Sequence, residues 1–229
     1  MFAVYYCREM TKTVSQIPRR FYRKFKGKTY ILLLKENLEC QKSILDCGCG
    51  RSSPIKDVPL KSYTVGVDLF KPALLESKKA KIHENYVLAD INNLCFKPKS
   101  FSAVVALDFL EHLKKADGYW AIRNMENLAT DSILIVTPNG FLRQSERGGN
   151  VFQVHLSGWR TEELEELGFK VFGLNGLKFL RKEEAEIRFR PKAIFSEVSI
   201  VSQKLAYHFP KIAFQLLGVK KMRRNPQTL

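Results

Sequence analysis

Residues 45–54, Leu-Asp-Cys-Gly-Cys-Gly-Arg-Ser-Ser-Pro, close a short apolar segment and bring glycines beside an acid. Gly48 and Gly50 allow a ligand to approach the backbone closely, because neither residue has a side chain in the way. Ser53 as N-cap and Pro54 at the first helical position predict a helix start, which favours an anionic group such as a carboxylate. The segment therefore predicts a loop that holds a small ligand.

Three aspartates extend this motif. Asp46 lies within the loop, and Asp68 and Asp90 each end a short apolar segment. Parallel strands bring their carboxyl ends to one edge of a sheet, and ligands bind beyond that edge. We therefore expect the three carboxylates to project from one edge, where a ribose, an amine and an adenine can meet them.

A dinucleotide site is the alternative interpretation of this loop. It requires G-x-G-x-x-G and an acid about 20 residues further on, and Asp68 satisfies the spacing because it lies eighteen positions after Gly50. However, Ser53 takes the place of the third glycine, which removes the close helix–strand packing under a pyrophosphate. Asp46 also suits a cationic ligand group better than a diphosphate, so nicotinamide or flavin binding is the weaker interpretation.

The elements that must position these residues alternate along the chain. Five apolar segments without strict alternation indicate strands buried on both faces, namely residues 43–47, 63–68, 86–90, 102–108 and 132–137. Helical patterns lie between and after them, at residues 71–81, 117–128 and 161–167, the last with Thr161 as N-cap. Two further strands are expected at 171–174 and 213–219. This order predicts an α/β fold with a doubly wound, Rossmann-like, mostly parallel seven-stranded sheet and helices on both faces.

The net charge of +15 is unevenly distributed over what we expect to be one domain, residues 1–229. A basic helical N-terminal extension, residues 1–42, has ten basic residues against three acids, whereas the core motifs in residues 43–175 have sixteen of each. Residues 176–229 have twelve against four, and they include a helical insertion, residues 176–212, before the last strand. The excess charge at both ends favours an anionic partner, either nucleic acid or a membrane surface.

The insertion carries an apolar stripe at helical spacing, formed by Ile194, Phe195, Val198, Val201, Leu205 and Phe209. We expect this stripe to pack on the domain or across a homodimer, and contact with anionic lipid is the alternative. No apolar segment reaches the roughly 18 residues that span a bilayer, so no transmembrane segment is expected. The protein is expected to be cytoplasmic with reduced cysteines, or peripheral at an anionic membrane surface.

The motifs together resemble those of class I S-adenosylmethionine-dependent methyltransferases, of the small-molecule, methyltransferase type 11-like group, from about Ser43 to Val219. The segments that carry the resemblance are Leu45-Asp-Cys-Gly-Cys-Gly50, Val65-Gly-Val-Asp68, Ala89-Asp-Ile91, Ala106-Leu-Asp-Phe-Leu-Glu-His-Leu113, Thr137-Pro-Asn139 and His155-Leu-Ser-Gly-Trp159. The resemblance implies S-adenosylmethionine as cofactor and S-adenosylhomocysteine as product. It implies cofactor contacts from Asp46, Gly48, Cys49, Gly50, Asp68, Leu69, Asp90, Ile91 and Asp108.

The acceptor side of the site is expected to follow the fourth strand. The tetrapeptide Asn/Asp-Pro-Pro-aromatic, which suits exocyclic amines of bases, is replaced there by residues 108–112. We therefore expect an oxygen or carbon acceptor on a small molecule, anionic or lipid-associated, with Asp108 and His155 as catalytic residues. An RNA methyltransferase that uses the basic termini, or a non-catalytic protein that binds the cofactor, are the alternatives.

Asp108, Glu111 and His112 form D-x-x-E-H, which resembles the E-x-x-E-H of metal-assisted O-methyltransferases. Three such ligands could hold Mg²⁺ or Mn²⁺ and polarise a hydroxyl. Glu-His-Leu is also common in metal-free relatives, where it anchors the following helix. We favour that structural interpretation and expect no metal, with the three-residue site as the alternative.

Overall fold

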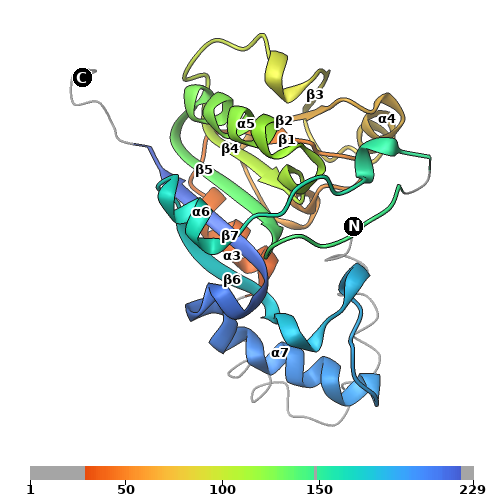
Figure 1. The fold of residues 1–229 in the computed structure, drawn as a ribbon. Helices are drawn as coiled ribbons and strands as arrows, with labels where there is room; N and C mark the ends of the chain where they lie inside the picture. Colours follow the sequence, from red (N-terminus) through yellow and green to blue (C-terminus); the bar gives the residue numbers. More distant parts are fainter. Residues whose placement is uncertain (1–28, 147–148, 223–229) are drawn as a thin grey trace.

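The computed structural model describes residues 29–146 and 149–222, which form one seven-stranded sheet with helices on both faces (Figure 1). The strand order is β3-β2-β1-β4-β5-β7-β6. The first five strands pair in parallel, and β7 is antiparallel to both β5 and β6. The strands are β1 (Ser43–Cys47), β2 (Tyr63–Asp68), β3 (Asn85–Leu88), β4 (Phe101–Leu107), β5 (Ala129–Pro138), β6 (Lys170–Leu177) and β7 (Ala213–Lys221). The doubly wound, mostly parallel sheet predicted from the sequence is therefore confirmed.

Burial on both faces explains why the central strands are apolar throughout. In β4, Val104 and Ala106 belong to one buried cluster, whereas Ala103 and Val105 belong to the other. The first cluster includes side chains of α5 (Lys115–Leu128) and α6 (Thr161–Glu166), and the second includes those of α3 (Tyr30–Leu38). Successive side chains of a strand point to opposite faces, so a strand between two helical layers needs apolar residues at every position.

Two local predictions need correction. Thr161 is the first residue of α6 and not its N-cap, which is Arg160; the carboxylate of Glu163 accepts a hydrogen bond from the Arg160 backbone N–H. The predicted cap at Ser53 is confirmed, because its hydroxyl accepts from Ile55 N–H, but only a 3-10 turn, Pro54–Asp57, follows it. Pro59 comes directly after Val58 and disfavours a helical conformation there, so the turn does not extend into an α-helix.

The basic extension is confirmed as helical only in its described part, where α3 begins after Thr29; residues 1–28 lie outside the described residues. The remaining helices are α4 (Lys71–Lys79) and α7 (Lys192–His208), and α7 forms the predicted insertion before β7. None of the helices in the described part of the chain is long and apolar enough to cross a membrane.

The apolar stripe of α7 does not pack on the domain. Five of its six side chains, Ile194, Val198, Val201, Leu205 and Phe209, are 43–58% exposed. The helix instead buries a mostly small and polar face, which consists of Ser199, Ile200, Gln203 and Ala206, and Gln203 bonds to β6. This face packs on the sheet because glycines in β6 allow the α7 backbone to approach the strand closely. A Cβ on Gly173 would lie 2.0 Å from the Ala206 carbonyl oxygen.

This close contact predicts that Gly173→Ala destabilises the protein by about 1–3 kcal/mol, since the added methyl group must displace the α7 backbone. The measurement is the free energy of unfolding in urea. Val201→Ala, on the exposed face of the same helix, is the matched control and should change it by less than about 0.5 kcal/mol. Equal effects of the two substitutions would contradict the proposed packing.

Candidate functional site

The loop after β1 is tied to the end of β2 by backbone hydrogen bonds. Gly48 and Gly50 have φ angles of 70° and 56°, in the left-handed region that favours glycine. Gly48 N–H and Cys49 N–H donate to the Val67 carbonyl at 2.8 and 3.0 Å. Gly50 N–H donates to Oδ2 of Asp68 at 2.7 Å, so two of the residues predicted to bind a cofactor are in direct contact.

The carboxylate of Asp68 is held at both oxygens. Oδ2 accepts from Gly50, and Oδ1 accepts from Phe70 N–H at 2.8 Å. Burial raises the pKa of Asp68 above its ordinary value, and these two hydrogen bonds act in the opposite direction. Each carboxylate oxygen has further lone pairs, so an oriented acceptor for ligand hydroxyls lies beside the glycine loop.

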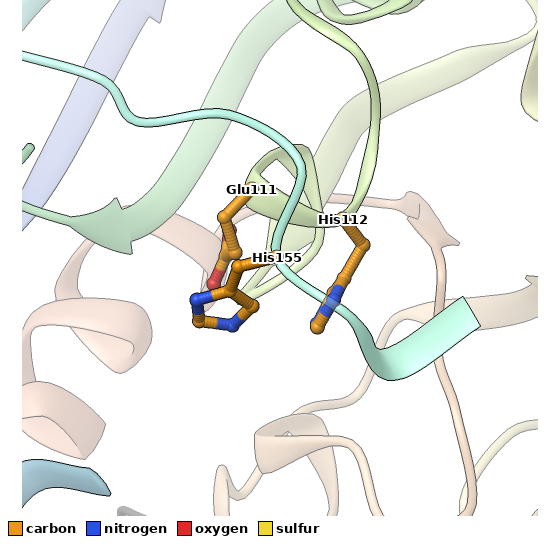
Figure 2. A group of neighbouring side chains, drawn as sticks. All are labelled: Glu111, His112 and His155. Atoms are coloured by element: carbon orange, nitrogen blue, oxygen red, sulfur yellow. The ribbon is translucent and has the colours of Figure 1, made fainter. Parts of the chain in front are cut away.

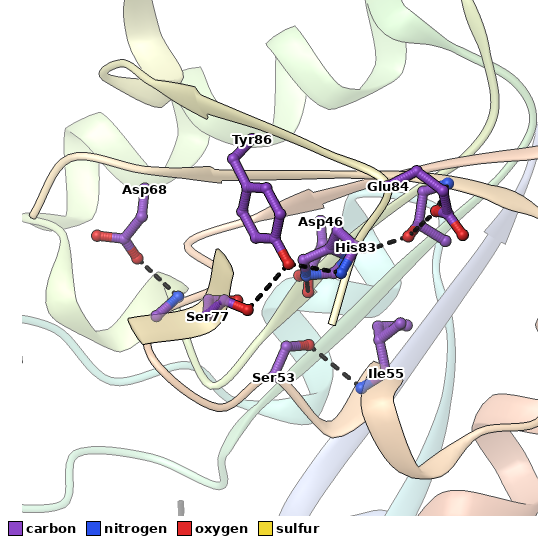
Figure 3. A network of polar contacts seen from close by, with 10 residues as sticks. Asp46, Ser53, Ile55, Asp68, Ser77, His83, Glu84 and Tyr86 are labelled. Atoms are coloured by element: carbon purple, nitrogen blue, oxygen red, sulfur yellow. Dashed lines mark hydrogen bonds and ion pairs between the residues drawn. The ribbon is translucent and has the colours of Figure 1, made fainter. Parts of the chain in front are cut away.

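Asp46 is placed differently from the other two aspartates. Its side chain is 1% exposed, and Oδ2 lies 3.4 Å from Nε2 of the buried His83 (Figure 3). Gly66 in β2 makes room for this histidine, since a Cβ there would be 2.5 Å from the imidazole. The predicted ligand contact of Asp46 remains a prediction, and in this structure its carboxylate lies against His83.

His83 continues the network beneath the loop. Its Nδ1 lies 3.2 Å from Oγ1 of Thr64, whose backbone and hydroxyl both donate to Glu84 Oε2 at 2.6 Å. Tyr86 accepts from His83 N–H at 2.8 Å, and its hydroxyl donates to the Ser77 carbonyl (Figure 3). Sequence reasoning missed this network, because only the register of β1, β2 and β3 places His83 beside Asp46.

The remaining predicted cofactor residues lie at the same edge of the sheet. Asp90 follows β3 and caps a 3-10 turn, with Oδ1 accepting from Asn92 N–H at 2.8 Å. Ile91 is buried in the core, whereas Leu69 is 47% exposed. Cys49 is buried, which raises the pKa of its thiol, and the described cysteines Cys40, Cys47, Cys49 and Cys95 are all free.

Asp108 follows β4 with a φ of 55°, an unusual conformation that aspartate tolerates better than most residues. Gln215 of β7 donates to Oδ1 of Asp108, and Asn175 of β6 donates to the amide oxygen of Gln215. Burial raises the pKa of Asp108 to about 6, partly offset by the hydrogen bond from Gln215. The carboxylate is thus fixed by the neighbouring antiparallel strands.

Glu111, His112 and His155 form a cluster in which one ligand atom from each side chain lies within 4.8 Å of the others (Figure 2). The two imidazole rings are 4.8 Å apart between centroids. Burial lowers the pKa of His112 to about 4, with a smaller contribution from His155. Burial also raises the pKa of Glu111 well above its ordinary value, helped by the charge of Asp108.

The residues of this cluster differ from the candidate metal ligands that the sequence suggested. Asp108 does not belong to it, so the three-residue alternative Asp108, Glu111 and His112 is not assembled, and His155 takes the place of Asp108. Asp108 stands apart because its carboxylate is turned to Gln215. His155 was predicted as a base on its own, and the sequence contains no signal for its contact with His112.

The sequence of the chain is similar to those of known proteins. Residues 45–132 match a family model described as "Methyltransferase domain". The chain is 27% identical over 153 residues to the uncharacterized protein MJ0638 of Methanocaldococcus jannaschii, and the match spans 66% of this chain and only 65% of that relative.

Solved structures share the fold at low identity. A SAM-dependent methyltransferase from Archaeoglobus fulgidus is 20% identical, with a TM-score of 0.51 over 88% of this chain and 98% of that one. Phosphoethanolamine N-methyltransferase 2 of Haemonchus contortus, in complex with S-adenosyl-L-methionine, is 17% identical, with a TM-score of 0.53 over 89% and 56%. At these identities the likeness shows the fold.

The Asp46–His83 contact predicts a cost when one partner is removed. His83→Leu leaves the buried carboxylate of Asp46 without its neighbour, so the free energy of unfolding should fall by about 1–3 kcal/mol. Urea denaturation measures the change, and His208→Leu, at an exposed histidine of α7, is the control. If both variants are as stable as the wild type, the contact contributes nothing to the loop.

Proposed function

We propose that this chain carries a class I S-adenosylmethionine-dependent methyltransferase domain and that it methylates an oxygen or carbon atom of a small molecule. The observation that supports this best is the oriented carboxylate of Asp68 beside the glycine loop, with the half-buried carboxylate of Asp108 after β4 nearby as a proton acceptor. One edge of the sheet thus combines a cofactor subsite with groups that could serve an acceptor.

The residues present fit S-adenosylmethionine. A Cβ on Gly50 would meet no atom within 4 Å, so there is open space at the loop where the chain would face the cofactor. Asp68 would accept hydrogen bonds from the ribose hydroxyls, and Asp90 would lie by the adenine. Gly48 and Gly50 would let the backbone approach the methionine part closely.

Bound S-adenosylmethionine supplies a methyl group on a positively charged sulfur, which is open to in-line attack. When bound, the cofactor would give up this methyl group to the acceptor atom, and its sulfur would keep the electron pair of the broken sulfur–methyl bond. The chain's own residues orient the acceptor and take its proton. Asp108 is suited to this, because burial raises its pKa above the ordinary value and so makes it a stronger base than a solvent-exposed carboxylate. His155 is the second candidate.

The acceptor class rests on the loop after β4. Asp108 and the following Phe-Leu-Glu111 occupy the place of the aromatic tetrapeptide that suits amines of nucleic-acid bases. Phe109 packs on Gly48, where a Cβ would lie 2.0 Å from the ring, so this loop also supports the cofactor side. The half-buried carboxylate of Asp108 and the buried imidazole of His155 favour an acceptor that loses a proton, such as a hydroxyl.

Asp68→Ala should weaken S-adenosylmethionine binding roughly 10- to 100-fold, because hydrogen bonds to a charged acceptor contribute about 1.5–3 kcal/mol. Isothermal titration calorimetry measures the dissociation constant. Asp57→Ala, an exposed aspartate in the turn after the loop, is the matched control and should bind as the wild type does. Unchanged affinity in Asp68→Ala would contradict the cofactor site.

The acceptor class can be tested directly with methyl-labelled S-adenosylmethionine and fractionated cell extract. We expect the label in the small-molecule fraction, lipids included. Label in the RNA fraction would overturn the proposal in favour of the RNA alternative. If the cofactor binds but no fraction is labelled, the non-catalytic alternative holds instead.

With the labelled fraction as acceptor, Asp108→Asn should lower kcat by roughly 10²- to 10⁴-fold, the range of a lost general base. The side-chain oxygen of asparagine can still accept from Gln215, so the loop should keep its conformation. Glu197→Gln, on α7, is the control. A kcat equal to that of the wild type would exclude Asp108 as the base.

A further inference from the structure

We propose that Glu111, His112 and His155 form a binding site for a divalent transition-metal ion, made by two segments of the chain that meet beside the end of β4. One carboxylate oxygen and one nitrogen from each ring lie within 4.8 Å of one another. Figure 2 shows the three side chains converging from the turn that holds Glu111 and His112 and from the segment that holds His155. The ligand set differs from that of the Mg²⁺ or Mn²⁺ alternative suggested by the sequence, because His155 takes the place of Asp108.

Backbone carbonyls fix the proton on each imidazole. Nδ1 of His112 lies 3.2 Å from the Val154 carbonyl, and Nδ1 of His155 lies 2.6 Å from the Leu142 carbonyl. A carbonyl oxygen only accepts, so each Nδ1 donates its hydrogen, and in the neutral form of each ring Nε2 carries the lone pair. A histidine ligand of a metal commonly has this arrangement, with the other ring nitrogen donating to a carbonyl.

The carboxylate of Glu111 supplies an independent observation. Its side chain is 2% exposed, and Oε2 has no hydrogen-bond partner among the described residues. An unpaired carboxylate oxygen in the interior is costly, and a bound cation would remove that cost. The side chain extends toward the two imidazoles and not away from them (Figure 2).

The two segments are held together without the metal. The carbonyl of Glu111 accepts from Leu156 N–H at 2.8 Å and from Ser157 N–H at 3.1 Å. The Ser157 hydroxyl also donates to the Leu110 carbonyl at 3.2 Å. These bonds place His155 beside His112 although 43 positions separate the two residues, so the ligands are already close before an ion binds.

The ligand types select the class of ion. Two imidazoles and one carboxylate suit Zn²⁺, Fe²⁺ or Co²⁺, whereas Mg²⁺ and Ca²⁺ prefer oxygen ligands throughout. Bonds of about 2.0–2.2 Å would require the three side chains to draw together by roughly 1 Å. Three protein ligands leave a coordination position open for water or an acceptor oxygen; that role rests on the proposed function, but the binding itself does not.

The test uses the full chain, freed of metal with a chelator and titrated with Co²⁺ while visible absorption is followed. We expect one Co²⁺ per chain, with bands typical of nitrogen and oxygen ligands. His155→Gln and His112→Gln should each weaken binding at least about tenfold, whereas His208→Gln, at an exposed histidine of α7, should not. Circular dichroism shows that the variants are folded, and S-adenosylmethionine affinity, measured in parallel, tests the proposed function separately.

Three results would overturn the proposal. The first is the absence of saturable binding at one equivalent, and the second is equally strong binding in the wild type and both ligand variants. A thiolate-to-cobalt charge-transfer band would place the ion on cysteines instead. Because Glu111 is deeply buried, Glu111→Gln can unfold the protein, and the two histidine variants decide the outcome without it.

Discussion

The bond between Asp68 and the backbone of Gly50 is the contact on which the geometry of the site depends. It joins the loop after β1 to the end of β2, and the second oxygen of the same carboxylate holds the start of the next segment through Phe70. A partly buried carboxylate keeps its charge only when such donors replace water. Both loops are therefore fixed by one side chain, which remains able to accept bonds from a ligand.

Much of the fold could be predicted because its strands are buried on both faces. Ser43–Cys47 and Tyr63–Asp68 match their predicted bounds, since an apolar segment closed by glycine or by an acid is a local signal. Packing of the α7 stripe on the domain, one of the placements predicted for it, was wrong for the opposite reason. Its apolar residues suggest a core face. Which face of α7 packs on the sheet is decided instead by glycines in β6, which lie twenty or more residues away in sequence.

The site was predicted only as far as single motifs allow. Glycines and aspartates at strand ends identify the edge of the sheet, because topology alone brings them together. The partners of Asp46 and His155 could not be predicted, since each is chosen across strands or loops by the register and by backbone bonds. Strand register and backbone bonds between loops decide whether a titratable side chain contacts a ligand or another side chain. A sequence motif does not specify either of them.

The position of β7 has a consequence for synthesis of the chain. β7 lies between β5 and β6, and among the described strands β6 pairs only with β7. While the ribosome is still translating α7, β5 and β6 each have an edge whose backbone groups are unpaired. Unpaired strand edges can form hydrogen bonds with other chains. Completion of the sheet is thus delayed until β7 emerges, and the nascent chain is most vulnerable to aggregation while α7 is being synthesised.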